Sequence, residues 1–255
     1  MISSLPDPEP FEGPRVVQSH SPWSLVDIFV FGVFSALTVL LLPAGIIEIW
    51  HIFNPTFGLS DVTATDQILL QAVVDLVIVG FIAFLIKVVH GLPFLRTIHW
   101  FKNYRYGKGF LISLGITLAI SVSVIGSRFP SKEASPLEKL LSSNRAMFAF
   151  AILGVAVAPL LEEVVFRGFL FKVLSDIGGT VIAVMVTAIS FGALHALQLW
   201  GNWIAVLLIF VVGFVLSFVR HRSNSLIPSF IIHTAYNSTF FGALILGTLL
   251  QKVGH

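Results

Sequence analysis

The chain has 255 residues, of which 56% are hydrophobic and 11% are charged, and its mean hydropathy is +0.94. Soluble domains carry about 25% charged residues, so this composition predicts a membrane protein with several spans and membrane lipid as its surroundings. The net charge of +2 offers no basic surface of the kind that binds nucleic acid, and we expect no such partner. Cysteine is absent, which excludes disulfides, thiolate metal sites and a cysteine nucleophile.

Residues 1–22 contain five of the twelve prolines and no apolar core, so we expect a disordered N-terminal tail. Residues 23–255 are expected to form a single membrane domain, with its functional core at about 146–250. A helix needs about 20 mostly apolar residues to cross the hydrocarbon of a bilayer. The sequence therefore predicts an all-α bundle of seven transmembrane helices, at residues 24–47, 67–90, 109–127, 146–172, 179–199, 203–220 and 226–250. A break near Gly242 in the last run would make eight.

The distribution of basic residues predicts the orientation of these spans. Nine lysines and arginines, Arg220 among them, fall on the side of the N-terminus and five on the other side. Basic residues favour the cytoplasmic side, so we expect a cytoplasmic N-terminus. We also expect the protein to be an integral multi-pass protein of a prokaryotic cell membrane. Segment 94–106, which is both basic and aromatic, is expected to lie along that surface as a helix.

The fourth predicted span carries three ionisable residues, Glu162, Glu163 and Arg167. A charge near the bilayer centre costs about 3 kcal/mol on insertion scales, so we expect a specific role for each. Residues four apart share one helix face, and Glu163 is expected to pair with Arg167. Glu162 is rotated by about 100° and has no partner on its own helix. Pro159, one turn earlier, is expected to kink the helix.

Polar residues also occur in three other spans. His195 lies in the fifth, His233 and Asn237 share one face of the seventh, and Asp75 follows Gln71 by one turn in the second. Each of these residues could have a purely structural role, as a hydrogen-bonding group between helices, and for Asp75 we expect such a role. Glu162, the histidines and Asn237 together suit amide hydrolysis. Glu162 would act as general base on water, His195 would hold that water or pass its proton on, and His233 with Asn237 would donate to the oxyanion.

Three motifs, in this order, resemble those of the CAAX protease and bacteriocin-processing (CPBP, or Abi) family: Glu162-Glu163-x-x-x-Arg167, Phe191-x-x-x-His195 and His233-x-x-x-Asn237. The resemblance covers residues 148–237, and small residues around Gly213 resemble a further glycine-containing motif of the family. It implies an intramembrane endopeptidase, similar to the type II prenyl-protein proteases, that acts on a membrane-associated, lipidated or prenylated protein or peptide.

By this analogy Glu162 and His195 activate the water, and His233 and Asn237 form the oxyanion site. Glu163, Arg167 and Phe191 would support them.

Alternatives remain at this stage. A zinc-dependent mechanism would use Glu162, His195 and His233, a ligand set of two histidines and a glutamate, although known sites of this type usually take two ligands from one helix. A proton-coupled or cation transporter would use Glu162, Asp75 and the histidines as a relay, although the sequence shows no paired repeat. A non-catalytic immunity or interaction protein of the membrane is the third reading.

Overall fold

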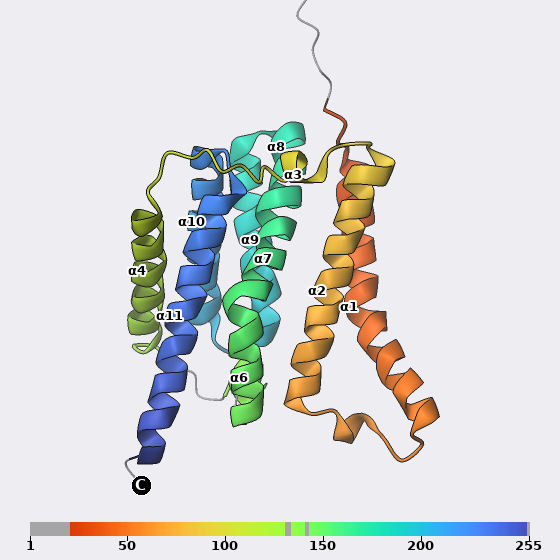
Figure 1. Ribbon diagram of the computed structural model, residues 1–255, viewed down its shortest axis with the longest axis vertical. Coiled ribbons are helices and arrows are strands. Elements are labelled where there is room, and N and C mark those ends of the chain that lie inside the picture. Colours follow the sequence, from red (N-terminus) through yellow and green to blue (C-terminus); the bar gives the residue numbers. More distant parts are fainter. Residues whose placement is uncertain (1–20, 131–133, 141–142, 254–255) are drawn as a thin grey trace, which may run out of the picture.

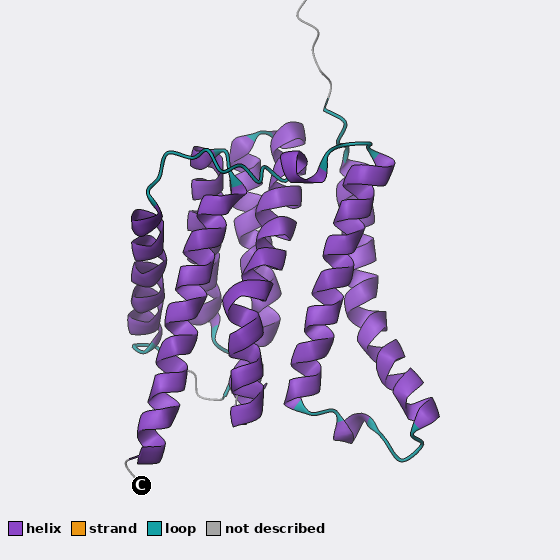
Figure 2. Cartoon of the chain, in the orientation of Figure 1, coloured by secondary structure: helices purple, strands orange, loops and turns teal. Residues whose placement is uncertain are grey.

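The computed structural model describes residues 21–130, 134–140 and 143–253. Throughout these residues the chain forms helices and loops and no strand, as Figure 2 shows, which confirms the predicted all-α class. All but the last two residues of the expected tail at 1–22 lie outside the described residues.

Six long helices make up most of the described chain: α1 (Leu25–Phe53), α2 (Ala64–Phe84), α4 (Lys108–Gly126), α9 (Thr180–Gln198), α10 (Trp203–Ser223) and α11 (Leu226–Val253). The shorter helices are α3 (Phe94–Thr97), α5 (Pro136–Leu140), α6 (Asn144–Ile152), α7 (Ala158–Glu163) and α8 (Phe171–Gly178). A 3-10 turn, η1 (Leu59–Asp61), follows α1. Wider π-helical turns extend α2 as η2 (Leu85–Val89), join α6 to α7 as η3 (Leu153–Val157) and join α7 to α8 as η4 (Val164–Leu170).

The helices fit the predicted spans closely. Within the described residues, six helices are long and apolar enough to cross a membrane, and the pair Asn144–Val155 and Ala158–Gly178, bent by 42°, makes a seventh if it is one span. The bend lies beside Pro159, where a kink was expected because proline lacks the amide hydrogen of a helical bond. Helix α11 continues past Gly242 without a break, so the eight-span alternative is wrong.

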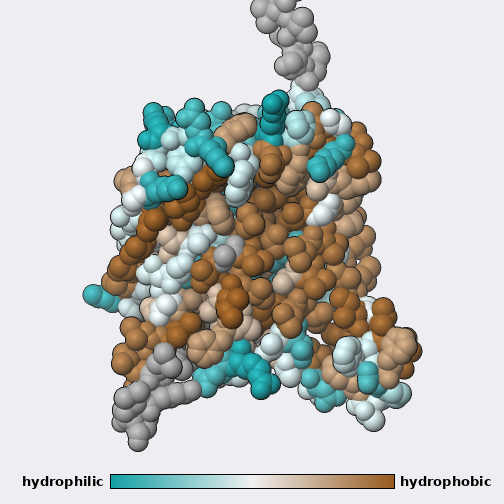
Figure 3. Space-filling model, in the orientation of Figure 1, coloured by the Kyte–Doolittle hydropathy of each residue, from teal (hydrophilic) through white to brown (hydrophobic). Residues whose placement is uncertain are grey.

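The helices pack in two groups (Figure 1). Helices α1 and α2 pair at one side, while α4 packs on α11 and α9 packs on α10 in the other group, with the chain from α6 to α8 between them. In Figure 3 the middle of the visible face is apolar and both ends are hydrophilic. Large apolar side chains such as Phe29, Leu40 and Phe53 are exposed on α1, as lipid contact requires.

Segment 94–106 differs from its prediction, because only the single turn of α3 is helical. His99 adopts a φ of 57°, which ends the helix, and its carbonyl oxygen accepts a hydrogen bond from the Leu226 amide at 2.9 Å. The Ser225 hydroxyl donates to the Phe101 carbonyl oxygen at 2.6 Å. The segment is therefore a loop anchored to the start of α11.

Arg220 also differs from its expected place among the surface charges. Its side chain is only 2% exposed, because α10 extends three residues beyond the predicted span and packs this residue inside the bundle. Without Arg220 the predicted charge asymmetry is eight basic residues against five, in the same direction.

Candidate active site

The bent helix from α6 to α8 carries the acidic pair into the interior of the bundle. Glu162 and Glu163 are the last two residues of α7, and Arg167 lies in the π-helical turn η4 that follows. Such turns insert an extra residue into a helix and occur frequently at functional sites.

Glu163 and Arg167 form the predicted pair. The Arg167 Nη1 donates to Glu163 Oε1 at 3.0 Å, and both side chains are completely buried. The Arg167 Nη2 donates to the Gly213 carbonyl oxygen at 3.0 Å, and the guanidinium lies 4.4 Å from the centre of the Phe191 ring. A Cβ at Gly213 would meet the Phe191 ring at 3.0 Å, so glycine permits this contact with α10.

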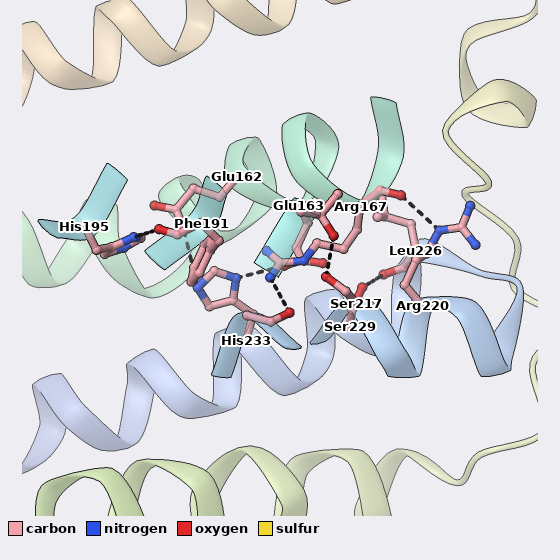
Figure 4. Close-up of polar contacts among 12 residues, drawn as sticks. Glu162, Glu163, Arg167, Phe191, His195, Ser217, Arg220, Leu226, Ser229 and His233 are labelled. Carbon is pink, nitrogen blue, oxygen red and sulfur yellow. Dashed lines mark hydrogen bonds and ion pairs between the residues drawn. The ribbon is translucent and has the colours of Figure 1, made fainter. Parts of the chain in front are cut away.

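His233 of α11 contacts both glutamates. Its Nδ1 lies 3.1 Å from Glu163 Oε1, and its Nε2 lies 3.5 Å from Glu162 Oε2 (Figure 4). The Glu162 side chain remains 27% exposed, whereas that of Glu163 is fully buried. Glu162 therefore has its partner on another helix, as its rotation predicted, and it is the glutamate with access to open space.

His195 lies one turn beyond Phe191 on α9. Its Nδ1 hydrogen bonds to the Phe191 carbonyl oxygen at 2.8 Å, which requires a hydrogen on Nδ1 and, in the neutral ring, leaves Nε2 as an acceptor. The Phe191 ring contacts both histidines, with centroid distances of 4.5 Å to His195 and 5.7 Å to His233. No hydrogen bond joins His195 to Glu162 among the described residues, so a bridging group such as water would have to connect them.

Asn237 lies one turn after His233 on α11, on the face that the spacing predicted. Its Nδ2 donates to the Gly154 carbonyl oxygen at 2.6 Å, in the π-helical turn η3. The amide group carries two hydrogens, so one remains for another acceptor. Asn237 thus fixes α11 against the bent helix and keeps one donor.

A cleft of about 210 Å³ lies between α2, the helix from α6 to α7, and the end of α9. Ala158 and Leu161, which precede Glu162 on α7, line this cleft. So do Gln71 and Asp75 of α2, which are joined by the predicted hydrogen bond from Gln71 Nε2 to Asp75 Oδ1 at 2.8 Å. The cleft therefore offers a mostly apolar surface with a polar edge beside the acidic pair.

The three ligands of the zinc alternative come from three different helices, α7, α9 and α11. The described part of the chain contains no group of three or more His, Asp or Glu side chains arranged to hold a metal ion. Glu162, His195 and His233 are therefore not gathered as a ligand set in this structure.

Two further features of the site carry no clear sequence signal. The Thr187 and Ser217 hydroxyls, both fully buried, hydrogen bond at 2.9 Å and link α9 to α10. Arg220 Nε donates to the Arg167 carbonyl oxygen at 3.0 Å. Both contacts depend on how α10 is rotated, which the even hydrophobicity of that helix does not indicate.

Residues 144–239 match the family model described as "Type II CAAX prenyl endopeptidase Rce1-like", and this segment holds all seven residues of the three motifs. The resemblance to the CPBP family is confirmed. The chain is also similar to "Putative membrane peptidase YdiL" of Bacillus subtilis (strain 168), with 25% identity over 232 residues, 85% of this chain and 86% of that protein. No solved structure gives a significant match. These CPBP-type comparisons support intramembrane protease activity and, with the apolar helices, an integral multi-pass membrane protein.

Proposed function

We propose that this protein is an intramembrane endopeptidase in which Glu162 activates the water that hydrolyses a peptide bond. The observation that carries the proposal is the difference between the two adjacent glutamates. Glu163 is fully buried and neutralised by Arg167, whereas Glu162 is partly exposed, faces His233 and directly follows Leu161 of the cleft lining. An intramembrane carboxylate that is not neutralised on its own helix is a candidate functional group.

The charges of the site are balanced when His233 carries two hydrogens. Glu162 and Glu163 then offset Arg167 and His233. His233 Nδ1 can donate to Glu163 Oε1 at 3.1 Å, whereas Nε2 forms an ion pair with Glu162 Oε2 at 3.5 Å. In this arrangement Glu162 faces His233 without a direct hydrogen bond to it. The same Nε2 hydrogen is then free to turn its interaction toward substrate oxygen.

The reaction is hydrolysis without a covalent enzyme intermediate. Glu162 takes one proton from the water, His195 Nε2 accepts a hydrogen bond from its remaining O–H, and the water oxygen attacks the scissile carbonyl carbon. His233 Nε2–H and the free amide hydrogen of Asn237 donate to the oxyanion. Glu162 then returns its proton to the leaving amine as the C–N bond breaks, which gives a new carboxyl group and a new amino group.

The substrate is expected to enter from the bilayer side of the cleft. Its wall is mostly apolar, with Asp75 and glutamine side chains at the edge, which suits an extended peptide segment whose main chain needs hydrogen-bond partners. A membrane-protein tail, a lipidated peptide and a prenylated protein all present such a segment. The family description names a prenyl endopeptidase, so a prenylated peptide is one substrate to test.

The reaction can be tested with protein reconstituted in phospholipid vesicles and given libraries of prenylated and unmodified peptides in ¹⁸O-labelled water. We expect mass spectrometry to show cleavage with one ¹⁸O atom in the new carboxyl group, and we expect the activity to survive dialysis against a strong chelator. Failure of the wild type to cleave any peptide would contradict the proposal. Activity that is lost with chelator and restored by zinc would favour the metal-dependent alternative.

A further inference from the structure

A second cavity, of about 180 Å³, lies at the upper end of the bundle in Figure 1, away from the cleft. The first half of α8, the start of α9, the end of α10 and the loop after α3 surround it. A water molecule occupies about 30 Å³ in the liquid, so the cavity has room for a group with several oxygen atoms. Its lining includes Lys172, Thr180, Arg220 and His221.

Arg220 is the distinctive member of this lining. It is 98% buried, its Nε donates to the Arg167 carbonyl oxygen, and its guanidinium lies 5.1 Å from the Phe171 ring centre. Its two terminal nitrogens have no hydrogen-bond or ion-pair partner among the described residues, and Figure 4 shows them directed away from the network around Arg167. A buried guanidinium normally meets a carboxylate or phosphate with these nitrogens.

The surroundings of Arg220 are also positive. Lys172 lies at the cavity, with its Nζ 2.5 Å from Asp176 Oδ2, and the same carboxylate oxygen accepts a bond from Ser21. Helix α9 begins at the cavity, and its N-cap residue, Gly179, has no side chain that could satisfy the first amide groups. The start of a helix with free amides attracts an anion.

His99 also lines this cavity. Burial and the charges of Arg220 and Lys172 lower its pKa to about 4, so the ring is neutral at pH 7. An arginine, a lysine, a neutral histidine and a helix start therefore face one space, and the nearby Asp176 carboxylate is shared between Lys172 and Ser21.

We propose that this cavity binds a phosphate group, held by the terminal nitrogens of Arg220, by Lys172 and by the first amides of α9. The elements around the cavity lie at an end of the bundle that is hydrophilic in Figure 3, which is where the phosphates of lipid headgroups lie. The group can come from an anionic phospholipid or from phosphate in solution. Binding would also hold the Arg220 side chain in place, and its Nε hydrogen bonds to the carbonyl oxygen of Arg167.

The test uses the full-length protein, delipidated in a maltoside detergent. Native mass spectrometry measures retention of phosphatidylglycerol and of phosphatidylcholine, and the melting temperature is measured with sodium phosphate and with sodium chloride at equal ionic strength. We expect retention of phosphatidylglycerol over phosphatidylcholine. A rise in melting temperature with inorganic phosphate as well would show that phosphate alone suffices, and no rise would show that the lipid headgroup is required.

Arg220→Gln and Lys172→Gln are each expected to weaken this binding on the order of tenfold, because each removes a charged donor. Lys102→Gln, an exposed lysine in the loop at the same end, is the matched control and should bind as the wild type does. If Arg220→Gln fails to fold, Lys172→Gln on the partly exposed rim decides the question. The proposal is overturned if the wild type binds neither phosphatidylglycerol nor phosphate, or if the control loses binding as much as the two cavity variants.

Discussion

Glu162 and Glu163 are adjacent in the sequence, but a helix turns by about 100° per residue and gives them different surroundings. Glu163 is held by Arg167 and His233 in the dry interior. Glu162 points to His233 and to the open side of α7. The different roles that we propose for the two glutamates thus follow from one step along the helix.

The Glu163–Arg167 pair should contribute strongly to stability. Removal of one partner from a buried pair costs about 3–5 kcal/mol, because the other charge is left unpaired. We therefore expect Arg167→Met to lower the melting temperature in detergent sharply, and the double variant Glu163→Gln/Arg167→Met to recover part of the loss. Arg96→Met, an exposed arginine, is the control and should melt as the wild type does. Equal melting of Arg167→Met and wild type would show that the pair is dispensable.

The contacts that could be predicted at this scale are those within one helix. The four-residue spacings indicated the Glu163–Arg167 and Gln71–Asp75 bonds. Contacts between helices could not be predicted in the same way. The burial of Arg220 depends on the rotation of α10 against α8, and the two-sided contact of His233 depends on the rotation of α11.

At the scale of elements, close helix packing depends on a few glycines. Helices α4 and α11 approach so closely that a Cβ on Gly115 would lie 2.4 Å from the Ile232 carbonyl oxygen and 2.7 Å from the Ala235 Cβ. Backbone atoms cannot give way as a flexible side chain can. The position of α11, and with it His233, therefore depends on this glycine.

Gly115→Ala should destabilise the protein by about 1–3 kcal/mol, as overpacking does in close-packed interiors. The matched control is Gly80→Ala in α2, where a Cβ would meet nothing within 4 Å. We expect the first variant to melt at a lower temperature in detergent and the second to be unchanged. The close approach would be contradicted by identical melting of the two variants.

The loop anchored by His99 should make stability depend on pH. The folded-state pKa of His99, about 4, is below its ordinary value of 6.5, because burial and the nearby Arg220 and Lys172 disfavour the charged ring. The unfolded chain therefore takes up a proton at His99 as the pH falls through 6.5, while the folded chain does so only near 4. Protonation thus favours the unfolded chain, and the free energy of unfolding decreases over this pH interval.

In the His99→Asn variant, the melting temperature should fall less steeply between pH 6.5 and pH 4 than it does in the wild type. Asparagine tolerates the positive φ of this position, so the backbone is preserved. An equally steep decline in both proteins would contradict this role of His99.

The long helices themselves were largely predictable, because each apolar run is close to the length of a membrane span. The kink was predictable from Pro159. The π-helical turns on either side of α7 and the short extent of α3 were not predicted. The segment after α3 is held by a residue distant in the sequence, through the hydrogen bond from the Leu226 amide of α11 to the His99 carbonyl oxygen.

At the scale of the whole molecule, an apolar belt separates two hydrophilic ends (Figure 3). The loop after α3 and the cavity around Arg220 lie at one end, and η1 lies at the other (Figure 1). The excess of basic residues at the first end leads us to propose that it faces the cytoplasm.

The absence of cysteine makes this orientation simple to test, because single-cysteine variants have no background. Lys102→Cys and Ser60→Cys place exposed thiols at the two ends. In intact cells, a membrane-impermeant maleimide should label the cysteine at position 60, and the cysteine at 102 should react only after the membrane is opened. The reverse pattern would contradict a cytoplasmic N-terminus.

The most direct test of the account is the rate of peptide cleavage by Glu162→Gln, with any cleaved peptide and under single-turnover conditions. Glutamine keeps the size of the side chain but cannot take a proton from water. A general base contributes about 10²–10⁴-fold, so we predict a loss of that order with an unchanged melting temperature. Glu48→Gln, the same change at an exposed position of α1, should cleave at the wild-type rate. Cleavage by Glu162→Gln at the wild-type rate would contradict the assignment of Glu162 as the base.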